Sequence, residues 1–430
     1  MPEDESQNET PPDGTKKPTL PPGYGDDGHE SSSEEDTPSG TKKPAGPPGT
    51  KKPAGPPASS GDDAGTKKPT LPPGFGDGAG GDGSADGEPA LSRKDFQSDQ
   101  DVRWCPGCGD YAILSAVQRL LPELDAEKAE HVFVSGIGCA GRFPYYMDTY
   151  GMHSIHGRAP AIATGLKASR PELQVWVVTG DGDALSIGGN HLIHALRRNV
   201  DLQLLLFNNE IYGLTKGQYS PTSERGKVTK SSPYGSIDAP LNPVRVALGA
   251  DASFVARTMD RDPQHMKAVM EQSYDHDGAA FVEIYQNCNI FNDGAFFEFT
   301  EKETKPERAL FLDDGAPMTF AEGKKGLRLD GLSLEVIDLE NGRFSTSDCL
   351  VHDASDEMLA ELLGRIFWDE PASNGSAGDQ KLPRPFGVIY QEQRPTYEKL
   401  LHTQIDGITE KKDAGDLDAL FRSGETWTVE

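Results

Sequence analysis

The feature that most constrains the fold is a pair of apolar runs of strand length, residues 173–179 and 202–207, on either side of a glycine turn and a helical stretch. The turn begins at Gly180, and the helix is expected over about residues 189–198. Strand, glycine turn, helix and strand form the unit of an open parallel sheet, in which ligands bind beyond the carboxyl ends of the strands. The sequence therefore predicts an α/β fold with an open, mostly parallel sheet flanked by helices.

Further elements follow the same alternation. Helical apolar spacing over residues 111–121, an apolar run at 131–135 and a small-residue stretch at 159–167 indicate helix, strand and helix. Another apolar run, residues 280–285, brings residues 286–288 to the same edge if it joins the sheet in parallel. Beyond about residue 300 we expect short strands and turns, then an acidic helix near 356–367.

The first 88 residues have a different composition from the rest. They contain copies of Gly-Thr-Lys-Lys-Pro that start at positions 14, 40, 49 and 65, with acidic, serine and glycine spacers. Such a segment buries too little apolar area to offset chain entropy, so it is predicted to be a disordered tail for solubility or tethering. We expect a cofactor-binding domain at 89–300, a C-terminal extension at 301–406 and an acidic tail at 407–430.

Charge and apolar patterning limit the classes of function. The formal net charge of −27 argues against a nucleic-acid binder, which needs a basic surface to neutralise phosphates. No apolar run reaches the roughly 18–20 residues that cross a bilayer, and the N-terminus lacks a secretory signal, so a cytoplasmic location is expected. Five cysteines, an odd number, indicate metal binding or catalysis rather than a disulfide framework.

A phosphate-binding pattern follows the two apolar runs. Gly180-Asp181-Gly182-Asp183 after the first, with an Asn pair ending at Asn209 after the second, resembles the thiamine diphosphate motif. Glycines allow close approach to phosphates, and Mg²⁺ requires oxygen ligands. Gly-Asp-Gly alone is equally a tight turn, but the Asn pair favours the motif, and the Gly-x-Gly-x-x-Gly of a dinucleotide site is missing. The resemblance implies Mg²⁺ ligands at Asp181, Asn209 and the Ile211 carbonyl, and cofactor contacts at Gly182, Asp183, Gly213 and Leu214.

Four cysteines lie beside glycines or other turn residues: Cys105, Cys108, Cys139 and Cys288. Their spacing suits a [4Fe–4S] cluster, a tetrahedral Zn²⁺ or a redox Cys-x-x-Cys. A neighbouring thiamine cofactor favours the cluster, because the electrons left after decarboxylation of a 2-oxoacid need a one-electron acceptor, which zinc is not. Cys349 lies beside an apolar run and is interpreted as a buried, inert thiol.

Four stretches together resemble the beta subunit of the 2-oxoacid:ferredoxin oxidoreductase family. They are WCPGCGDYAIL, SGIGCAGRFPYYMDTYGMHSIHGRAPAIATGLK, TGDGDALSIGGNHLIHALRRNVDLQLLLFNNEIYGLTKGQYSPTS and YQNCNIFND, within residues 103–293. The resemblance implies that one [4Fe–4S] cluster is bound by Cys105, Cys108, Cys139 and Cys288. It also implies thiamine diphosphate contacts at Ile137, Gly138, Cys139, Ala140 and His156. Ala140 and Gly141 depart from the Ser-Ser common in the family.

Three side chains are catalytic or specificity candidates. The run that starts at Arg142 resembles the 2-oxoglutarate branch, in which a guanidinium suits the second carboxylate of the substrate. The alternative is a surface arginine paired with Asp148 or a partner subunit. Lys216 is a second candidate for the same carboxylate. His156 is predicted to orient the cofactor or transfer protons, or else to be structural.

The resemblance implies a reaction and partners. A 2-oxoacid, with 2-oxoglutarate favoured, would react with coenzyme A and oxidised ferredoxin to give acyl-CoA, CO₂ and reduced ferredoxin. A glutamate that activates thiamine would come from a separate alpha subunit, so we expect the chain to be inactive alone. Two alternatives remain open: a non-redox thiamine enzyme subunit, and a zinc-stapled scaffold with a disordered interaction tail.

Overall fold

The structure is a computed structural model, and it describes residues 91–367, 381–412, 415–425, 427 and 429. The chain divides into two units, residues 1–84 and 85–430, and all described residues belong to the second. The tail predicted to be disordered, residues 1–88, lies outside the described residues. The description below concerns the second unit.

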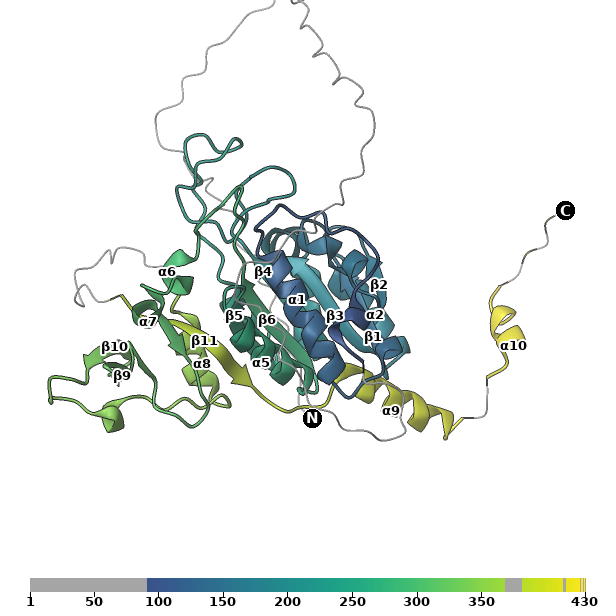
Figure 1. The fold of residues 1–430 in the computed structure, drawn as a ribbon. Helices are drawn as coiled ribbons and strands as arrows, with labels where there is room; N and C mark the ends of the chain where they lie inside the picture. The colour runs from purple at the N-terminus through teal and green to yellow at the C-terminus, as the bar shows by residue number, and fades with distance from the viewer. Residues whose placement is uncertain (1–90, 368–380, 413–414, 426, 428, 430) are drawn as a thin grey trace, which may run out of the picture. The chain divides into compact units, whose positions relative to one another are not determined.

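Within the described residues, eight strands form one sheet in the order β2-β1-β3-β4-β6-β5-β11-β7 (Figure 1). Neighbouring strands from β2 to β5 all pair in parallel, whereas β11 pairs antiparallel with β5 and parallel with β7. The predicted open, mostly parallel sheet is therefore confirmed. The strand bounds are β1 His131–Ser135, β2 Tyr150–His153, β3 Gln174–Gly180, β4 Leu202–Asn208, β5 Phe254–Met259, β6 Ala279–Tyr285, β7 Ala309–Phe311 and β11 Arg384–Gln391.

Helices cover both faces of this sheet. The helix bounds are α1 Asp110–Leu120, α2 Ala159–Ser169, α3 Gly189–Arg197, α4 Pro243–Gly249, α5 Pro263–Tyr274, α6 Phe297–Thr300, α7 Lys305–Arg308, α8 Glu357–Gly364, α9 Tyr397–Thr409 and α10 Leu417–Phe421. One apolar cluster joins the sheet to α2, α3, α4 and α8, and another joins the sheet to α1 and α5. The expected helices at 111–121, 159–167 and 189–198 correspond to α1, α2 and α3.

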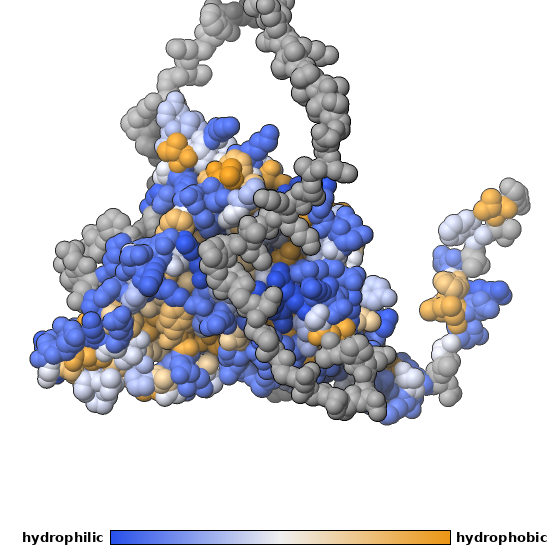
Figure 2. Space-filling model, in the orientation of Figure 1, coloured by the Kyte–Doolittle hydropathy of each residue, from blue (hydrophilic) through white to orange (hydrophobic). Residues whose placement is uncertain are grey.

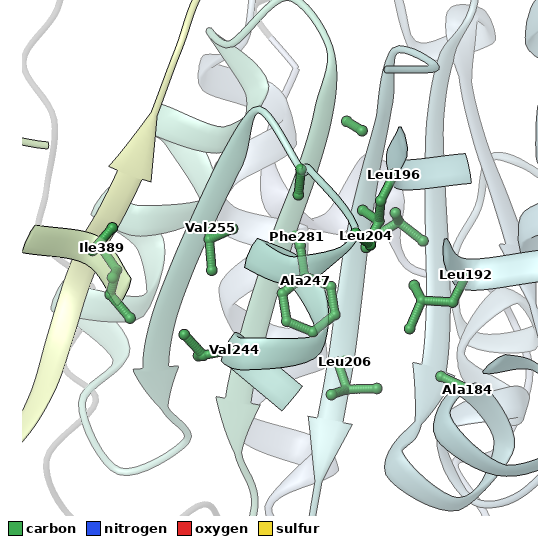
Figure 3. Close-up of a cluster of buried hydrophobic side chains, with 14 of the residues drawn as sticks. Ala184, Leu192, Leu196, Leu204, Leu206, Val244, Ala247, Val255, Phe281 and Ile389 are labelled. Atoms are coloured by element: carbon green, nitrogen blue, oxygen red, sulfur yellow. The ribbon is translucent and has the colours of Figure 1, made fainter. Parts of the chain in front are cut away.

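The two clusters are separated by the alternation of side chains along β4. Leu204 and Leu206 belong to the cluster with α3 and α4, whereas Leu205 and Phe207 belong to the cluster with α1 and α5. All four side chains are at most 1% exposed. Figure 3 shows Leu204 and Leu206 among side chains of α3, α4 and the neighbouring strands. Because both faces of β4 are buried, its sequence is a continuous apolar run rather than an alternating one.

The C-terminal part of the chain contributes to the same sheet. The extension expected from residue 301 supplies β7 and β11, which complete one edge of the main sheet. It also forms a three-stranded antiparallel sheet of β8 Thr319–Phe320, β9 Lys325–Asp330 and β10 Ser333–Asp338. Cys349 is buried beside Gly326 of β9, as its apolar surroundings indicated.

The viewed surface of the described residues is largely hydrophilic. Figure 2 shows mostly hydrophilic side chains on the viewed face of the described residues, with smaller apolar areas between them. None of the helices in the described part of the chain is both long and apolar enough to cross a membrane.

We predict a pH-dependent loss of stability from His131, the first residue of β1. Its ring is fully buried, and neither ring nitrogen has a hydrogen-bond partner among the described residues. Burial lowers the pKa of His131 from 6.5 to about 4. Between those pH values the unfolded chain binds a proton that the folded chain does not, so stability falls as the pH decreases from 6.5 to 4. The loss reaches about 3 kcal/mol.

Replacing His131 with Phe removes this titration. The Phe ring retains the aromatic contact with Phe96, which lies 6.2 Å away between ring centroids. Urea unfolding of both proteins at pH 7 and at pH 4.5 measures the effect. The stability lost between the two pH values should be smaller in His131→Phe by up to about 3 kcal/mol. An equal loss in both proteins would contradict the prediction.

Candidate cofactor site

The candidate site lies where four adjacent strands end. β1, β3, β4 and β6 are neighbours and run in parallel, so the loops that follow them leave the sheet at one edge. These loops begin at residues 136, 181, 209 and 286. The carboxyl edge of a parallel sheet is where ligands collect in α/β folds. The structure thus brings together the loops that carry the predicted thiamine and cysteine motifs.

Asp181 follows β3 and is held by two hydroxyl groups. Ser220 Oγ and Thr222 Oγ1 both donate to Asp181 Oδ2, at 2.5 and 2.6 Å. Burial raises the pKa of Asp181 to about 6, and the two hydroxyl hydrogen bonds act in the opposite direction. A bound cation would favour the ionised carboxylate, so a buried aspartate in this position suits a metal ligand. Neither hydroxyl contacts the other carboxylate oxygen of Asp181, Oδ1.

Asn209 follows β4 and has both ends of its amide engaged. Its Nδ2 donates to Gln286 Oε1 at 2.8 Å, and its Oδ1 accepts the Ile211 N–H at 3.2 Å. Tyr212, three residues after Asn209, donates from its hydroxyl to the Gly182 carbonyl at 2.9 Å. A Cβ on Gly182 would collide with the Tyr212 ring, so this contact requires glycine. Asp181, Asn209 and the Ile211 carbonyl each offer an oxygen, the kind of ligand that Mg²⁺ prefers.

Asp183 ties three loops together. Its Oδ1 accepts the N–H of Ile137 at 3.2 Å, the N–H of Gly157 at 2.9 Å and a hydrogen bond from His156 Nδ1. Its Oδ2 accepts the Thr179 hydroxyl at 2.8 Å. The carboxylate is therefore used to hold the loops after β1 and β2 against the loop after β3. Asp183 is also predicted to contact the cofactor, so it would both contact the cofactor and hold these loops together.

These residues line a single pocket. All the residues assigned to Mg²⁺ or to thiamine diphosphate at the phosphate motif and at the loop after β1 border it. The lining consists of Asp110, Ile137, Gly138, Cys139, Ala140, His156, Gly180, Asp181, Gly182, Asp183, Phe207, Asn209, Ile211, Tyr212, Gly213, Leu214 and Thr215.

The predicted cysteine ligands lie beside the same pocket. The sulfurs of Cys139 and Cys288 are 3.7 and 3.4 Å from the position that a Cβ on Gly213 would occupy, so their separation cannot exceed the sum of those distances. Cys108 Sγ accepts a hydrogen bond from Gln286 Nε2 at 3.2 Å. Cys105 is exposed and is linked to Cys108 by the turn in which the Cys108 N–H donates to the Cys105 carbonyl.

The Cys-x-x-Cys turn is attached to the loop after β6. The Gly109 N–H donates to the Asn287 carbonyl at 3.1 Å, and Asn289 Nδ2 donates to the Pro106 carbonyl at 2.7 Å. One main-chain and one side-chain hydrogen bond therefore join segments almost two hundred residues apart in sequence. This attachment holds the turn of Cys105 and Cys108 against the segment that carries Cys288.

Three of these thiols, those of Cys108, Cys139 and Cys288, are in surroundings that favour their neutral form. Burial raises the pKa of Cys108, of Cys288 and of Cys139, the last to about 12. Within the described residues, no group of three or more His, Cys, Asp or Glu side chains forms a ready-made site for a metal ion. The four cysteines supply the donor chemistry that an iron–sulfur cluster uses, and binding would displace their protons.

Comparison with known proteins identifies a family model and several relatives that this chain resembles. The family model described as the thiamine pyrophosphate enzyme C-terminal TPP binding domain matches residues 136–284. The 2-oxoglutarate oxidoreductase subunit KorB of Mycobacterium tuberculosis is 51% identical over 343 residues, which cover 78% of this chain and 88% of that protein. The chain belongs to the beta-subunit family of the 2-oxoacid:ferredoxin oxidoreductases. Its motif resemblance to that family is confirmed.

Other relatives agree with this assignment. The 2-oxoacid:ferredoxin oxidoreductase beta subunit of a Sulfolobus species is 45% identical over 212 residues, 49% of this chain and 68% of that protein. A solved 2-oxoglutarate:ferredoxin oxidoreductase from Magnetococcus marinus, with 2-oxoglutarate, coenzyme A and succinyl-CoA bound, aligns with a TM-score of 0.60 and 31% identity. That alignment covers 78% of this chain and 97% of the solved one. This beta subunit thus carries a thiamine diphosphate-binding domain in a related fold.

The two carboxylate-binding candidates lie outside the pocket lining. Arg142 is half-buried, and its Nη1 donates to the Arg103 carbonyl at 3.0 Å. Asp148, considered as its partner, instead pairs with Lys128 at 2.7 Å. Lys216 is exposed and has a φ of +77° in the turn that follows Gly213. His156, by contrast, borders the pocket.

Several residues of the site were missed in the sequence. Asp110, Tyr212 and Thr215 line the pocket, and Ser220 and Thr222 hold Asp181. Ser220 and Thr222 lie in a turn in which the Ser223 N–H donates to the Ser220 carbonyl at 3.1 Å, and the available signal was the Ser-Pro-Thr-Ser sequence typical of a turn. That signal is weak in a loop of unknown path. The role of Gln286 had no signal beyond its closeness to Cys288.

We predict that Thr222→Val weakens binding of Mg²⁺ and thiamine diphosphate. The substitution keeps the side-chain shape but removes the hydroxyl that bonds to Asp181 at 2.6 Å and to Asn208 Oδ1 at 3.0 Å. Loss of a group that orients a metal ligand typically costs about 10- to 100-fold in affinity. Titration of the Mg²⁺-dependent binding of thiamine diphosphate to the enzyme measures the effect.

Thr258→Val is the matched control. Thr258 is also a buried threonine, and its hydroxyl is bonded to His265 on α5, away from the pocket. Its variant should bind thiamine diphosphate like the wild type. Equal affinities for the two valine variants would refute the role assigned to Thr222.

Proposed function

We propose that this chain is the beta subunit of an enzyme that oxidatively decarboxylates 2-oxoglutarate, with coenzyme A as acyl acceptor and ferredoxin as electron acceptor. The observation that carries the proposal is the convergence of two donor sets on one pocket. Oxygen donors follow β3 and β4. Two of the four sulfur donors, Cys139 and Cys288, follow β1 and β6; Cys139 lines the pocket and Cys288 lies beside its residue Gly213. The names of the relatives, which include 2-oxoglutarate oxidoreductases, agree with this reading.

Asp181, Asn209 and the Ile211 carbonyl would hold Mg²⁺ bound to the cofactor diphosphate. Gly182 and Gly213 leave room for close approach of the backbone to the phosphates. When bound, thiamine diphosphate supplies the electron sink for decarboxylation of a 2-oxoacid. The protein's part is to hold that cofactor in the pocket between the loops after β1, β3 and β4.

His156, which lines the pocket, would accept and donate a proton during the reaction. Its Nδ1 is engaged by the Asp183 carboxylate, so Nδ1 carries the hydrogen and Nε2 has a free lone pair. A histidine oriented in this way by a carboxylate is suited to accept and return a proton at Nε2. We assign this role to His156 and an orienting role to Asp183.

Cys105, Cys108, Cys139 and Cys288 would bind one [4Fe–4S] cluster. Such a cluster accepts electrons one at a time, as a ferredoxin-dependent reaction requires. Cys139 also borders the thiamine pocket, which would bring the cluster next to the reacting centre. A structural Zn²⁺ would use the same thiols without accepting electrons.

Arg142 would bind the second carboxylate of 2-oxoglutarate, with Lys216 as the competing candidate. The Arg142 N–H donates to the Cys139 carbonyl at 3.1 Å, so its main chain adjoins the loop that lines the pocket. One guanidinium nitrogen is bonded to the Arg103 carbonyl, and a guanidinium has five N–H donors in all.

The site also suggests a partner subunit. No glutamate is among the pocket-lining residues that the structure describes, whereas thiamine activation in this family uses one. An alpha subunit would complete the site, and the active enzyme would contain both chains. We place this enzyme in the cytoplasm, where ferredoxin and coenzyme A are available to it.

The decisive test is anaerobic purification of the chain with its alpha subunit. The complex should contain iron and thiamine diphosphate, absorb visible light and show a reduced-state EPR signal. It should reduce ferredoxin when given both 2-oxoglutarate and coenzyme A, and the beta chain alone should not.

Replacing Cys139 with Ala provides the internal control for the cluster, because it should remove the iron signal. Thiamine binding with turnover but without iron would favour a non-redox thiamine enzyme. A colourless zinc protein that binds no thiamine would favour a scaffold and contradict the proposal.

Substrate selection can be tested at Arg142. Loss of a charged hydrogen-bond pair costs about 2–3 kcal/mol, so Arg142→Ala should lower kcat/KM for 2-oxoglutarate roughly 100-fold. A monocarboxylate such as pyruvate should be affected much less. Lys216→Ala, assayed in parallel, reports on the competing candidate. Equal losses for both substrates in Arg142→Ala would refute the assignment.

A further inference from the structure

We infer that Gln286 is a positioning residue that connects the magnesium–thiamine site to the iron–sulfur site. The inference rests on the proposed function, since it assumes that both ligand sets are used. Gln286 is 1% exposed and is the first residue after β6. Its amide contacts one predicted ligand of each site, Asn209 and Cys108.

The backbone of Gln286 is firmly held. Its N–H donates to the Asn208 carbonyl at 2.9 Å, which continues the ladder between β4 and β6. The following N–H, that of Asn287, donates to the Asp260 carboxylate at 2.8 Å. A side chain that starts from such a fixed point has few ways to direct its amide.

The orientation of the amide is determined by an obligatory acceptor. Gln286 Nε2 donates to the Asn287 carbonyl at 2.8 Å, and a carbonyl oxygen can only accept. Nε2 therefore lies on that side, where its second hydrogen bond reaches Cys108 Sγ at 3.2 Å. The amide oxygen must then lie on the opposite side.

That opposite side determines how Asn209 is presented. Because Gln286 Oε1 accepts, Asn209 must turn its Nδ2 toward it, at 2.8 Å. The Asn209 oxygen is then directed away from Gln286, where it accepts the Ile211 N–H and serves as the oxygen available to Mg²⁺. A second tie acts on the same residue, because Asn292 Nδ2 donates to the Asn209 carbonyl at 2.9 Å.

The same amide would affect the cluster. A hydrogen bond donated to a ligating sulfur stabilises the more negative, reduced cluster, and hydrogen bonds of this kind help to set cluster potentials. The N–H of Gln286 would therefore raise the potential of the cluster. A single side chain would thus orient an oxygen ligand of Mg²⁺ and favour reduction of the neighbouring electron acceptor.

Gln286→Met in the complete enzyme tests both contacts. Met has a similar length but neither a strong donor nor a strong acceptor. We expect the cluster midpoint potential to fall below that of the wild type in an EPR-monitored redox titration. We also expect the Kd for thiamine diphosphate, measured with Mg²⁺ present, to rise about tenfold.

Gln118→Met is the matched control. Gln118 on α1 is also buried, donates from Nε2 to the Tyr146 carbonyl at 3.0 Å and accepts from Gln97 Nε2 at 3.3 Å. Gln118→Met removes the same two kinds of hydrogen bond, but away from both ligand sets. The cluster midpoint potential and the Kd for thiamine diphosphate of this variant should therefore equal those of the wild type.

The outcomes separate this inference from the proposed function. The connecting role of Gln286 would be overturned if the cluster midpoint potential of the Gln286→Met enzyme, its Kd for thiamine diphosphate, or both matched those of the control. A wild-type enzyme without iron or without thiamine would overturn the proposed function and the inference with it.

If the Gln286→Met enzyme fails to assemble, the wild-type enzyme can still test the hydrogen bond from Gln286 to Cys108. With glutamine side chains labelled with ¹⁵N, pulsed EPR of the reduced cluster should detect a coupled side-chain nitrogen. Absence of that coupling would contradict the hydrogen bond to Cys108.

Discussion

The parallel pairing of β1, β3, β4 and β6 is the constraint on which the rest of the site depends. Parallel strands must return through crossovers, so every loop that follows them leaves at one edge. The phosphate motif, the Asn pair and two of the cysteine segments follow these strands. Residues from positions 136 to 292 therefore meet at this edge. A shift of one strand to an antiparallel direction would move its ligands to the far edge.

Buried polar groups continue from this edge into the sheet. Arg257 and Glu283 form a fully buried ion pair at 2.7 Å on neighbouring strands, and Glu283 also accepts from Asn208 Nδ2 at 2.8 Å. The Thr222 hydroxyl, which donates to Asp181 at 2.6 Å, also lies 3.0 Å from Asn208 Oδ1 and shares its one hydrogen between the two acceptors. A buried ion pair is weak evidence for added stability, because desolvation opposes the attraction of the charges. Its contribution here is geometric, since it fixes the start of a chain of hydrogen bonds that ends at a proposed metal ligand.

Much of the sheet could be predicted because its central strands are buried on both faces. The apolar runs at 131–135, 173–179, 202–207 and 280–285 correspond to β1, β3, β4 and β6 within one or two residues. Two other strands of the sheet, β2 and β11, had no such signal. All four residues of β2 are exposed, and β11 pairs with β5 through a contact between distant segments. Pairing of that kind leaves no local pattern in the sequence.

The residues that line the pocket were predictable where they come from short motifs, but the loop residues that contact them were not. Gly180 to Asp183 and the Asn pair could be found because their spacing reflects strand ends. The hydroxyls of Ser220 and Thr222 could not, because the loop that carries them reaches Asp181 across about forty residues of chain. The position of Arg142 outside the pocket lining also depends on a local turn of the backbone, over residues 140–146, that no periodicity indicated.

The two aspartates of the phosphate motif show how one short segment serves two purposes. Asp183 accepts hydrogen bonds from the loops after β1 and β2 and from Thr179 of β3, so the protein itself supplies its partners. A Cβ on Gly136 would collide with this carboxylate, which explains glycine at the end of β1. Asp181 is also buried, but the two hydroxyls that reach it engage a single oxygen. Burial raises its pKa, and a cation would compensate that cost. The first aspartate therefore keeps one carboxylate oxygen that these hydroxyls do not engage, which is the oxygen proposed to bind Mg²⁺, and the second holds together the loops around the pocket.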